Sequence, residues 1–123
     1  MATIVVVEDQ PDSLKLLTTL LMLKGHQVVG LPNGDRLAEV MRTQQPVPDL
    51  VLLDIQLPGR DGYAVLEELK ELPGRSWKVV ALTAHALPED RARATAAGFD
   101  GYITKPIDVR TFPAEVARYL QPR

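Results

Sequence analysis

The sequence predicts an α/β protein built on a parallel sheet. Short apolar, mostly β-branched segments begin near residues 3, 27, 50, 78 and 101, and a segment of helical periodicity follows each of them. Strands that alternate with helices in this way form a parallel sheet with right-handed crossovers. The segment 50–53 has four consecutive apolar residues, as expected of a strand covered on both faces. The 123 residues have room for one such domain with its core.

The first half of the chain contains two strands and two helices. Residues 3–7 are nearly all β-branched, which favours a strand. A helix is predicted to begin at Pro11 and to end at Gly25, because proline suits a first helical turn and glycine a helix stop. A second strand at residues 27–31 precedes a short helix that ends before Pro46. The apolar stripe of the first helix consists of Leu14, Leu17, Thr18, Leu21 and Met22.

The middle of the chain is organised around the strand that ends at Asp54. Gly62 precedes an amphipathic helix over residues 63–70, which has its acids outward and stops at a Pro-Gly pair. The fourth strand is predicted over residues 78–82 and ends at Thr83.

The last third is predicted to hold two helices and one strand. Pro88 opens a fourth helix that stops at Gly98, and a strand over residues 101–104 follows. The final helix runs to about Leu120, with Pro113 in its first turn. Because alanine buries little area, we expect the fourth helix to be held loosely. Its thin apolar face consists of Ala92, Ala94, Ala96 and Ala97.

Composition excludes several classes of function. A net charge of −2 and a pI near 5.6 argue against a direct nucleic-acid partner. The sequence has no cysteine, which excludes disulfides, thiolate metal sites and thiol nucleophiles and fits a cytoplasmic protein. No apolar stretch approaches the about 18 residues of a membrane span, and the residues before the first strand are not basic, so we expect neither a membrane span nor a signal peptide. We expect residues 1–123 to form one domain without an output domain.

Four of the predicted strands end in residues that can bind phosphate or a hard cation: Glu8-Asp9, Asp54, Thr83 and Lys105. The carboxyl ends of parallel strands share one edge of the sheet, where an acid such as Asp54 should cost little burial. Magnesium prefers oxygen ligands, which Asp9 and Asp54 can supply while Glu8 reaches through water. Without a cation, two carboxylates about 4 Å apart repel by about 4 kcal/mol at an effective dielectric of 20. Lys105 and Thr83 would contact the oxygens of a phosphoryl group on Asp54.

These residues resemble the receiver domains of bacterial two-component response regulators, and the resemblance covers the whole chain. It implies a flavodoxin-like, doubly wound sheet of five βα units with strand order 2-1-3-4-5. The motifs that carry it are Glu8-Asp9, Asp54 with Pro58 and Gly62 in its loop, Ala81-Leu82-Thr83-Ala84, and Tyr102-Ile103-Thr104-Lys105-Pro106.

The resemblance implies a single-domain response regulator, similar to relay and cell-cycle regulators, in a two-component phosphorelay. Asp54 would accept a phosphoryl group from a histidine kinase or a histidine phosphotransfer protein. Mg²⁺ would be held by Asp9, Asp54 and the Gln56 carbonyl oxygen. Such a protein catalyses only its own phosphorylation and dephosphorylation, with Asp54 as nucleophile and the charge of Lys105 balancing the transferred group.

The resemblance also implies a switch. The Thr83 hydroxyl and the Tyr102 ring would move inward together, and the Lys105-Pro106 bond is commonly cis in the family. A downstream protein would bind the surface formed by the fourth helix, the fifth strand and the fifth helix. Gln56 and His85 occupy positions that tune dephosphorylation in the family.

Other interpretations stay open on the sequence alone. Glu8-Asp9 can act as N-terminal acids of the first helix, and Tyr102 can be an ordinary strand tyrosine. A flavin or nucleotide binder on this fold would need small residues after the first strand, where residues 8–12 would repel phosphate. A magnesium-dependent phosphohydrolase with an aspartyl-phosphate intermediate is the remaining alternative. Such enzymes carry the nucleophile and a second acid after the first strand, where this chain has only Glu8-Asp9.

Overall fold

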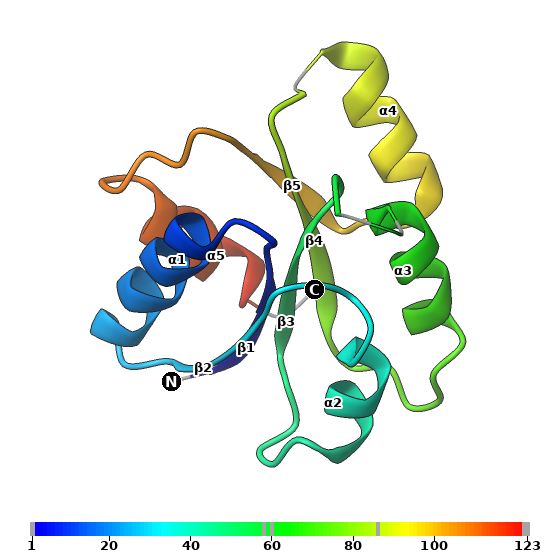
Figure 1. The fold of residues 1–123 in the computed structure, drawn as a ribbon, viewed down its shortest axis with the longest axis horizontal. Helices are drawn as coiled ribbons and strands as arrows, with labels where there is room; N and C mark the ends of the chain where they lie inside the picture. The colour runs from blue at the N-terminus through cyan, green and yellow to red at the C-terminus, as the bar shows by residue number, and fades with distance from the viewer. Residues whose placement is uncertain (1, 58, 60, 86, 122–123) are drawn as a thin grey trace.

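A five-stranded parallel sheet lies between two layers of helices (Figure 1). The computed structural model describes residues 2–57, 59, 61–85 and 87–121, so Pro58 of the predicted loop motif lies outside the described residues. The strands are β1 (Thr3–Val7), β2 (Gln27–Leu31), β3 (Leu50–Asp54), β4 (Lys78–Thr83) and β5 (Gly101–Thr104). The helices are α1 (Pro11–Leu23), α2 (Leu37–Thr43), α3 (Gly62–Lys70), α4 (Pro88–Ala97) and α5 (Phe112–Tyr119).

The strand order is β2-β1-β3-β4-β5, which confirms the order that the resemblance implied. The register aligns the carboxyl ends of the four strands that matter for the site. Val7 of β1 is the partner of Leu53, so Asp54 extends one residue beyond this pair. Asp54 is the partner of Leu82, and the next residue of β4, Thr83, is the partner of Thr104. Lys105 directly follows that pair, so the predicted polar residues reach one edge.

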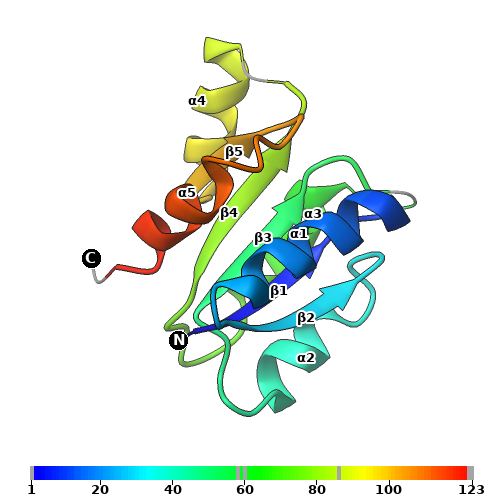
Figure 2. The same cartoon turned by 90° about the vertical axis from the view of Figure 1, so that its left-hand side faces the viewer.

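The two faces of the sheet bury separate clusters of apolar side chains. Alternate residues of β1 and β3 point to opposite faces, and both strands are buried throughout. One face packs against α2, α3 and α4. The other packs against α1 and α5, which lie in front of the sheet in Figure 2. This arrangement confirms that the apolar runs mark strands covered on both sides.

Two expectations about helix faces were wrong. Met22, which the periodicity places on the apolar stripe of α1, is 57% exposed, and Leu17 and Leu21 are the residues that α1 buries. Ala94 is the residue that α4 buries, whereas Ala92 and Ala96 are exposed. Alanine spacing alone does not define which side of a helix faces the sheet, because the side chain is too small to favour one orientation.

The ends of the elements follow their turn residues. Gly25 has φ 88° and closes α1, and Gly98 caps α4 with φ 111°. The Asp61 carboxylate accepts a hydrogen bond from the Ala64 amide at 2.9 Å and caps α3. The Lys105-Pro106 peptide bond is cis, as the resemblance implied. Within the described part of the chain, no helix has the length and apolar character needed to cross a bilayer.

Candidate functional site

The predicted site residues gather at the carboxyl edge of the sheet. Asp54 and Thr83 are the last residues of β3 and β4, and Lys105 follows β5. Glu8 follows β1, and its amide donates a hydrogen bond to the Leu31 carbonyl of β2 at 3.0 Å. The backbone of Lys105 is held in the same way, because its amide donates a hydrogen bond to the Thr83 carbonyl at 2.8 Å. Strand pairing thus brings the backbones of the four segments to one edge.

An acid cluster forms at this edge. Glu8, Asp9 and Asp54 each offer a carboxylate oxygen, and these three atoms lie within 4.8 Å of one another. The expectation of low burial was wrong, because Asp54 is only 3% exposed and Glu8 is fully buried. Asp9 is the half-buried member of the cluster. Burial raises the electrostatic cost of keeping several acids together, so the cluster requires a compensating charge.

Lys105 supplies part of that charge. Its Nζ donates hydrogen bonds to Asp54 Oδ2 at 2.8 Å and to Glu8 Oε2 at 2.5 Å. Burial lowers the pKa of Lys105, but the hydrogen bonds and charges of Asp54 and Glu8 outweigh it and leave that pKa raised. Lys105 is therefore a firmly held cation. Glu8, which was predicted to reach a magnesium ion through water, is bound directly to Lys105.

The Glu8 carboxyl behaves differently from its partner. Its pKa is raised, chiefly because burial penalises the charged form; the hydrogen bond from Lys105 lowers it, and the charge of Asp54 raises it. Glu8 also accepts a hydrogen bond from the Gln10 amide at 3.2 Å. The Glu8 side chain thus belongs to the acid cluster, and α1 begins after Gln10 without a side-chain cap.

The cluster fits a divalent hard cation. The cluster holds three carboxylates, of which the Lys105 ammonium binds Glu8 and Asp54, and oxygen atoms are the ligands that Mg²⁺ prefers. Asp9 and Asp54 would hold the ion together with the backbone carbonyl of Gln56. The Gln56 amide donates a hydrogen bond to Asp54 Oδ1 at 2.9 Å, which fixes the start of the loop against this carboxylate.

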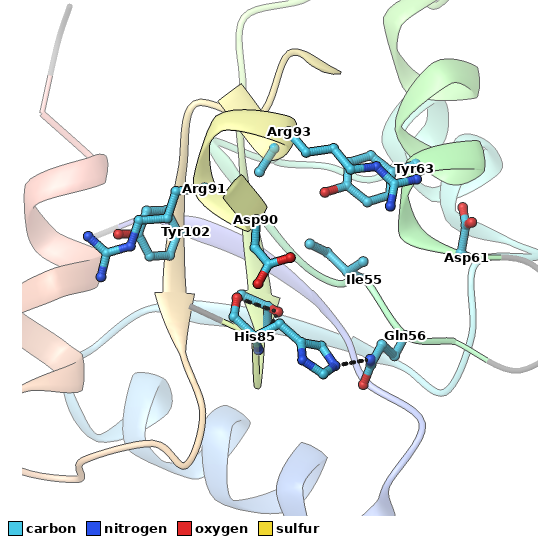
Figure 3. A pocket seen from close by; sticks show the side chains of 11 residues that line it. Ile55, Gln56, Asp61, Tyr63, His85, Asp90, Arg91, Arg93 and Tyr102 are labelled. Atoms are coloured by element: carbon cyan, nitrogen blue, oxygen red, sulfur yellow. Dashed lines mark hydrogen bonds between the residues drawn. The ribbon is translucent and has the colours of Figure 1, made fainter. Parts of the chain in front are cut away.

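Thr83 and His85 form a second group beside Asp54. The Thr83 hydroxyl is buried, accepts a hydrogen bond from the His85 amide at 2.9 Å and lies 3.2 Å from the His85 carbonyl oxygen. The hydroxyl is thus engaged by its own loop. The Gln56 and His85 side chains meet, with 2.5 Å between Gln56 Nε2 and His85 Nε2 (Figure 3). Sequence positions pointed to both residues but not to this contact.

A cleft of about 250 Å³ opens next to Thr83, between α3 and α4. Thr83, His85 and Tyr102 are among the residues that line it, so the two predicted switch residues border one space. Figure 3 shows Arg91 beside the Tyr102 ring and Arg93 beside the Tyr63 ring. The sequence analysis did not identify the contacts of these two arginines, because charged residues on a helix are normally expected to face solvent. Pro106, the remaining predicted switch residue, is exposed.

Known proteins are similar to this chain in both fold and sequence. Residues 4–117 match the family model described as the response regulator receiver domain. The sensor protein GacS of Pseudomonas syringae is 38% identical over 117 residues, which cover 92% of this chain and 13% of GacS. The polar-differentiation response regulator DivK of Brucella anthropi is 34% identical over 119 residues, covering 96% of this chain and 95% of DivK. The structure of the BeF3-activated DrrB receiver domain superposes with a TM-score of 0.83 at 28% identity, covering 99% of both chains.

A parallel sheet with strand order 2-1-3-4-5 and with an acid cluster, a hydroxyl and an ammonium at its carboxyl edge defines a flavodoxin-like α/β domain whose candidate site lies at the ends of its strands. With the family match over most of its length, the chain belongs to the response regulator receiver domains of two-component systems.

Proposed function

We propose that the protein accepts a phosphoryl group on Asp54 in an Mg²⁺-dependent reaction and signals through the change that follows. The observation that carries this proposal is the contact of 2.8 Å between Lys105 Nζ and Asp54 Oδ2 inside a cluster of three carboxylates. A buried acid held by one cation, with further acids for a metal ion beside it, is suited to accept charged phosphorus rather than to pack.

In the proposed step, an oxygen of Asp54 attacks phosphorus and forms an O–P bond. The N–P bond to the donor histidine breaks, and its electron pair returns to the imidazole nitrogen of the donor. A bound Mg²⁺ would neutralise negative charge on the transferred group. No separate general base is needed, because a carboxylate nucleophile, unlike a hydroxyl group, has no proton that must be removed before it attacks.

The Lys105 ammonium would then move toward the negative charge that the phosphoryl group adds to Asp54. Its ammonium already lies between two carboxylates, so a small movement brings it to a phosphoryl oxygen on Asp54. The Thr83 hydroxyl would exchange its contacts with the His85 backbone for another phosphoryl oxygen. Those two movements draw the loop after β4 toward the site and make room for Tyr102.

The partners follow from the chemistry of the donor. GacS is named a sensor protein and BarA of Shigella flexneri a histidine-protein kinase, and segments of both are similar to this chain. We infer that the donor here is a histidine kinase or a histidine phosphotransfer protein. The output would be a downstream protein bound by the surface of α4, β5 and α5, and the chain would turn over no other substrate.

The test is exposure of the purified protein to acetyl phosphate or beryllofluoride with Mg²⁺. Intact mass and a binding isotherm are expected to show one phosphoryl group, or one saturable site, in the wild type and none in Asp54→Asn. Asp12→Asn is the matched control, because Asp12 is an exposed acid in the first turn of α1. Labelling that persists in Asp54→Asn would overturn the proposal. Turnover of phosphomonoesters that depends on Asp54 would favour a phosphohydrolase instead.

A further inference from the structure

Two arginines of α4 each lie over a tyrosine ring. The guanidinium carbon of Arg91 is 4.7 Å from the ring centroid of Tyr102, on β5. The guanidinium carbon of Arg93 is 4.2 Å from the ring centroid of Tyr63, on α3. Figure 3 shows the two pairs on opposite sides of the cleft next to Thr83. Helix α4 therefore contacts both sides of the cleft, β5 and α3, through the same kind of cation–π contact.

These contacts matter because α4 buries little apolar area. Besides the two arginine contacts, the Lys70 ammonium of α3 donates a hydrogen bond to the Ala97 carbonyl oxygen at the end of α4, at 3.0 Å. Ala94 is the buried residue of the helix, and an alanine contributes little apolar area. The Tyr63 ring is itself anchored by an edge-on contact with Phe99, whose centroid is 5.7 Å away. Both tyrosines are half-buried and line the cleft next to Thr83, and Tyr102 also lines a groove toward α5.

We propose that Arg91 is a latch that holds the Tyr102 ring in its present position and so opposes activation. This inference rests on the proposed function, in which Tyr102 enters the cleft when Asp54 is phosphorylated. Arg91 lines the same cleft, and we take the Tyr102 ring to leave the Arg91 guanidinium as it turns further inward, so that the contact would exist in one state and be absent in the other. A contact made in one state alone shifts the equilibrium toward that state. Arg93 contacts a ring that stays in place, so it secures α4 in both states.

Removal of the latch should therefore favour the inward ring before any phosphorylation. In Arg91→Ala the ratio of inward to outward Tyr102 is expected to rise roughly two- to fivefold, the range that an exposed cation–π contact represents. Because ligand binding and ring position are linked, the apparent affinity for beryllofluoride with Mg²⁺ should tighten by no more than the same factor. Arg93→Ala is the matched control, because it removes the same charge and the same type of contact from the same helix.

The experiment uses the full chain labelled with 3-fluorotyrosine, whose ¹⁹F signals are assigned with Tyr→Phe variants. Saturating beryllofluoride on the wild type gives the signal position of the activated Tyr102. Without beryllofluoride, the Tyr102 signal of Arg91→Ala should move toward that position, and the signal of Arg93→Ala should not. Arg91→Met serves as a second variant that keeps the aliphatic stem, and thermal unfolding verifies that each variant folds.

The outcomes separate the latch from the proposed function. Failure of the wild type to bind beryllofluoride would refute phosphoryl acceptance, and the latch with it. If the wild type binds beryllofluoride, an unchanged Tyr102 signal and unchanged affinity in both Arg91 variants would overturn the latch alone. Equal effects of Arg91→Ala and Arg93→Ala would also overturn it, because they would indicate a general loosening of α4.

Discussion

The Lys105 ammonium and the Asp54 carboxylate lie 2.8 Å apart, although 51 positions separate the two residues in the chain. The same ammonium binds Glu8, so one cation connects the carboxyl ends of β1, β3 and β5. The site and the stability of this edge of the sheet therefore depend on the same side chain. A change at Lys105 should affect both phosphoryl acceptance and folding.

Lys105→Met should destabilise the protein. It leaves the Glu8 and Asp54 carboxylates buried without their cation, and the loss of one partner from such a cluster costs about 3 kcal/mol. Urea unfolding at neutral pH measures this loss. Added Mg²⁺ should restore part of the stability of the variant, because a cation bound to the carboxylates replaces the missing charge. Lys70→Met is the control, since Lys70 forms an exposed pair with Glu67 that contributes at most about 1 kcal/mol. Equal losses in the two variants would contradict the role given to Lys105.

Glu8 should make the protein less stable as the pH rises through the weakly acidic range. Burial raises the pKa of Glu8 in the folded state above the ordinary value of 4.5, so the folded protein holds this proton more tightly than the unfolded chain. The resulting stabilisation is fully present below pH 4.5 and is lost as the pH rises through the folded pKa. Urea unfolding of the wild type and Glu8→Gln over this range measures the effect. The difference in unfolding free energy between the two proteins should change with pH, and a constant difference would argue against a buried, titrating Glu8.

The alkaline limit of stability should depend on Lys105. The pKa of Lys105 is raised above 10.5 in the folded state because the bonds and charges of Asp54 and Glu8 together outweigh the opposing effect of burial. Its stabilisation is therefore present below pH 10.5 and is lost as the pH rises through the folded pKa. Lys105→Arg, which keeps the positive charge at high pH, should unfold at a higher pH than the wild type in an alkaline titration followed by circular dichroism. Arginine does not reproduce the geometry of an ammonium, so unfolding at a lower pH would indicate that contact geometry outweighs charge.

The sequence identified the fold and the edge that carries the site, because both follow from local patterns. Buried runs such as 50–53 mark strands, and the residue that ends each strand reaches the shared carboxyl edge. The burial of Asp54 and Glu8 was not predictable, because the spacing of the strands does not show how far neighbouring segments cover these side chains. The contacts of Arg91 and Arg93 were missed for a related reason, because they depend on how α4 is rotated against its neighbours. Of the four alanines predicted to form the apolar face of that helix, Ala94 and Ala97 face the core, and Ala92 and Ala96 are exposed.

Gly62→Ala should disturb the end of β3, which carries Asp54, and the loop that follows it. A Cβ atom at this position would lie 2.7 Å from the Asp54 carbonyl oxygen and 2.7 Å from Ile55 Cα, and backbone atoms cannot move aside as a side chain does. Alanine normally stabilises a helix by up to about 1 kcal/mol over glycine, but such overpacking costs about 1–3 kcal/mol, so the net change should be destabilising. Urea unfolding measures this change, and beryllofluoride affinity should fall with it.

Gly30→Ala is the matched control for that substitution. There the added Cβ meets side-chain atoms of Leu14 and Thr18 at 3.3 Å, and these can shift by a few tenths of an ångström. Its effect on stability should be smaller, and its beryllofluoride affinity should match the wild type. A Gly62→Ala variant as stable as the wild type would show that the loop after β3 can move without cost.

Helix α4 should be the least protected helix of its layer in amide hydrogen exchange, and its protection should depend on the state of Asp54. The neighbouring α3 buries Val65, Leu66 and Leu69, whereas α4 buries Ala94 and is otherwise held by polar contacts, among them the two arginine contacts described above. Few buried apolar contacts allow local opening well below the free energy of global unfolding. Exchange measured by mass spectrometry with and without beryllofluoride should therefore differ across residues 92–97, while α3 exchanges slowly in both states. Equal protection of residues 92–97 in the two states would place the signal elsewhere, because a helix that changes its packing on activation must also change how often its amides open.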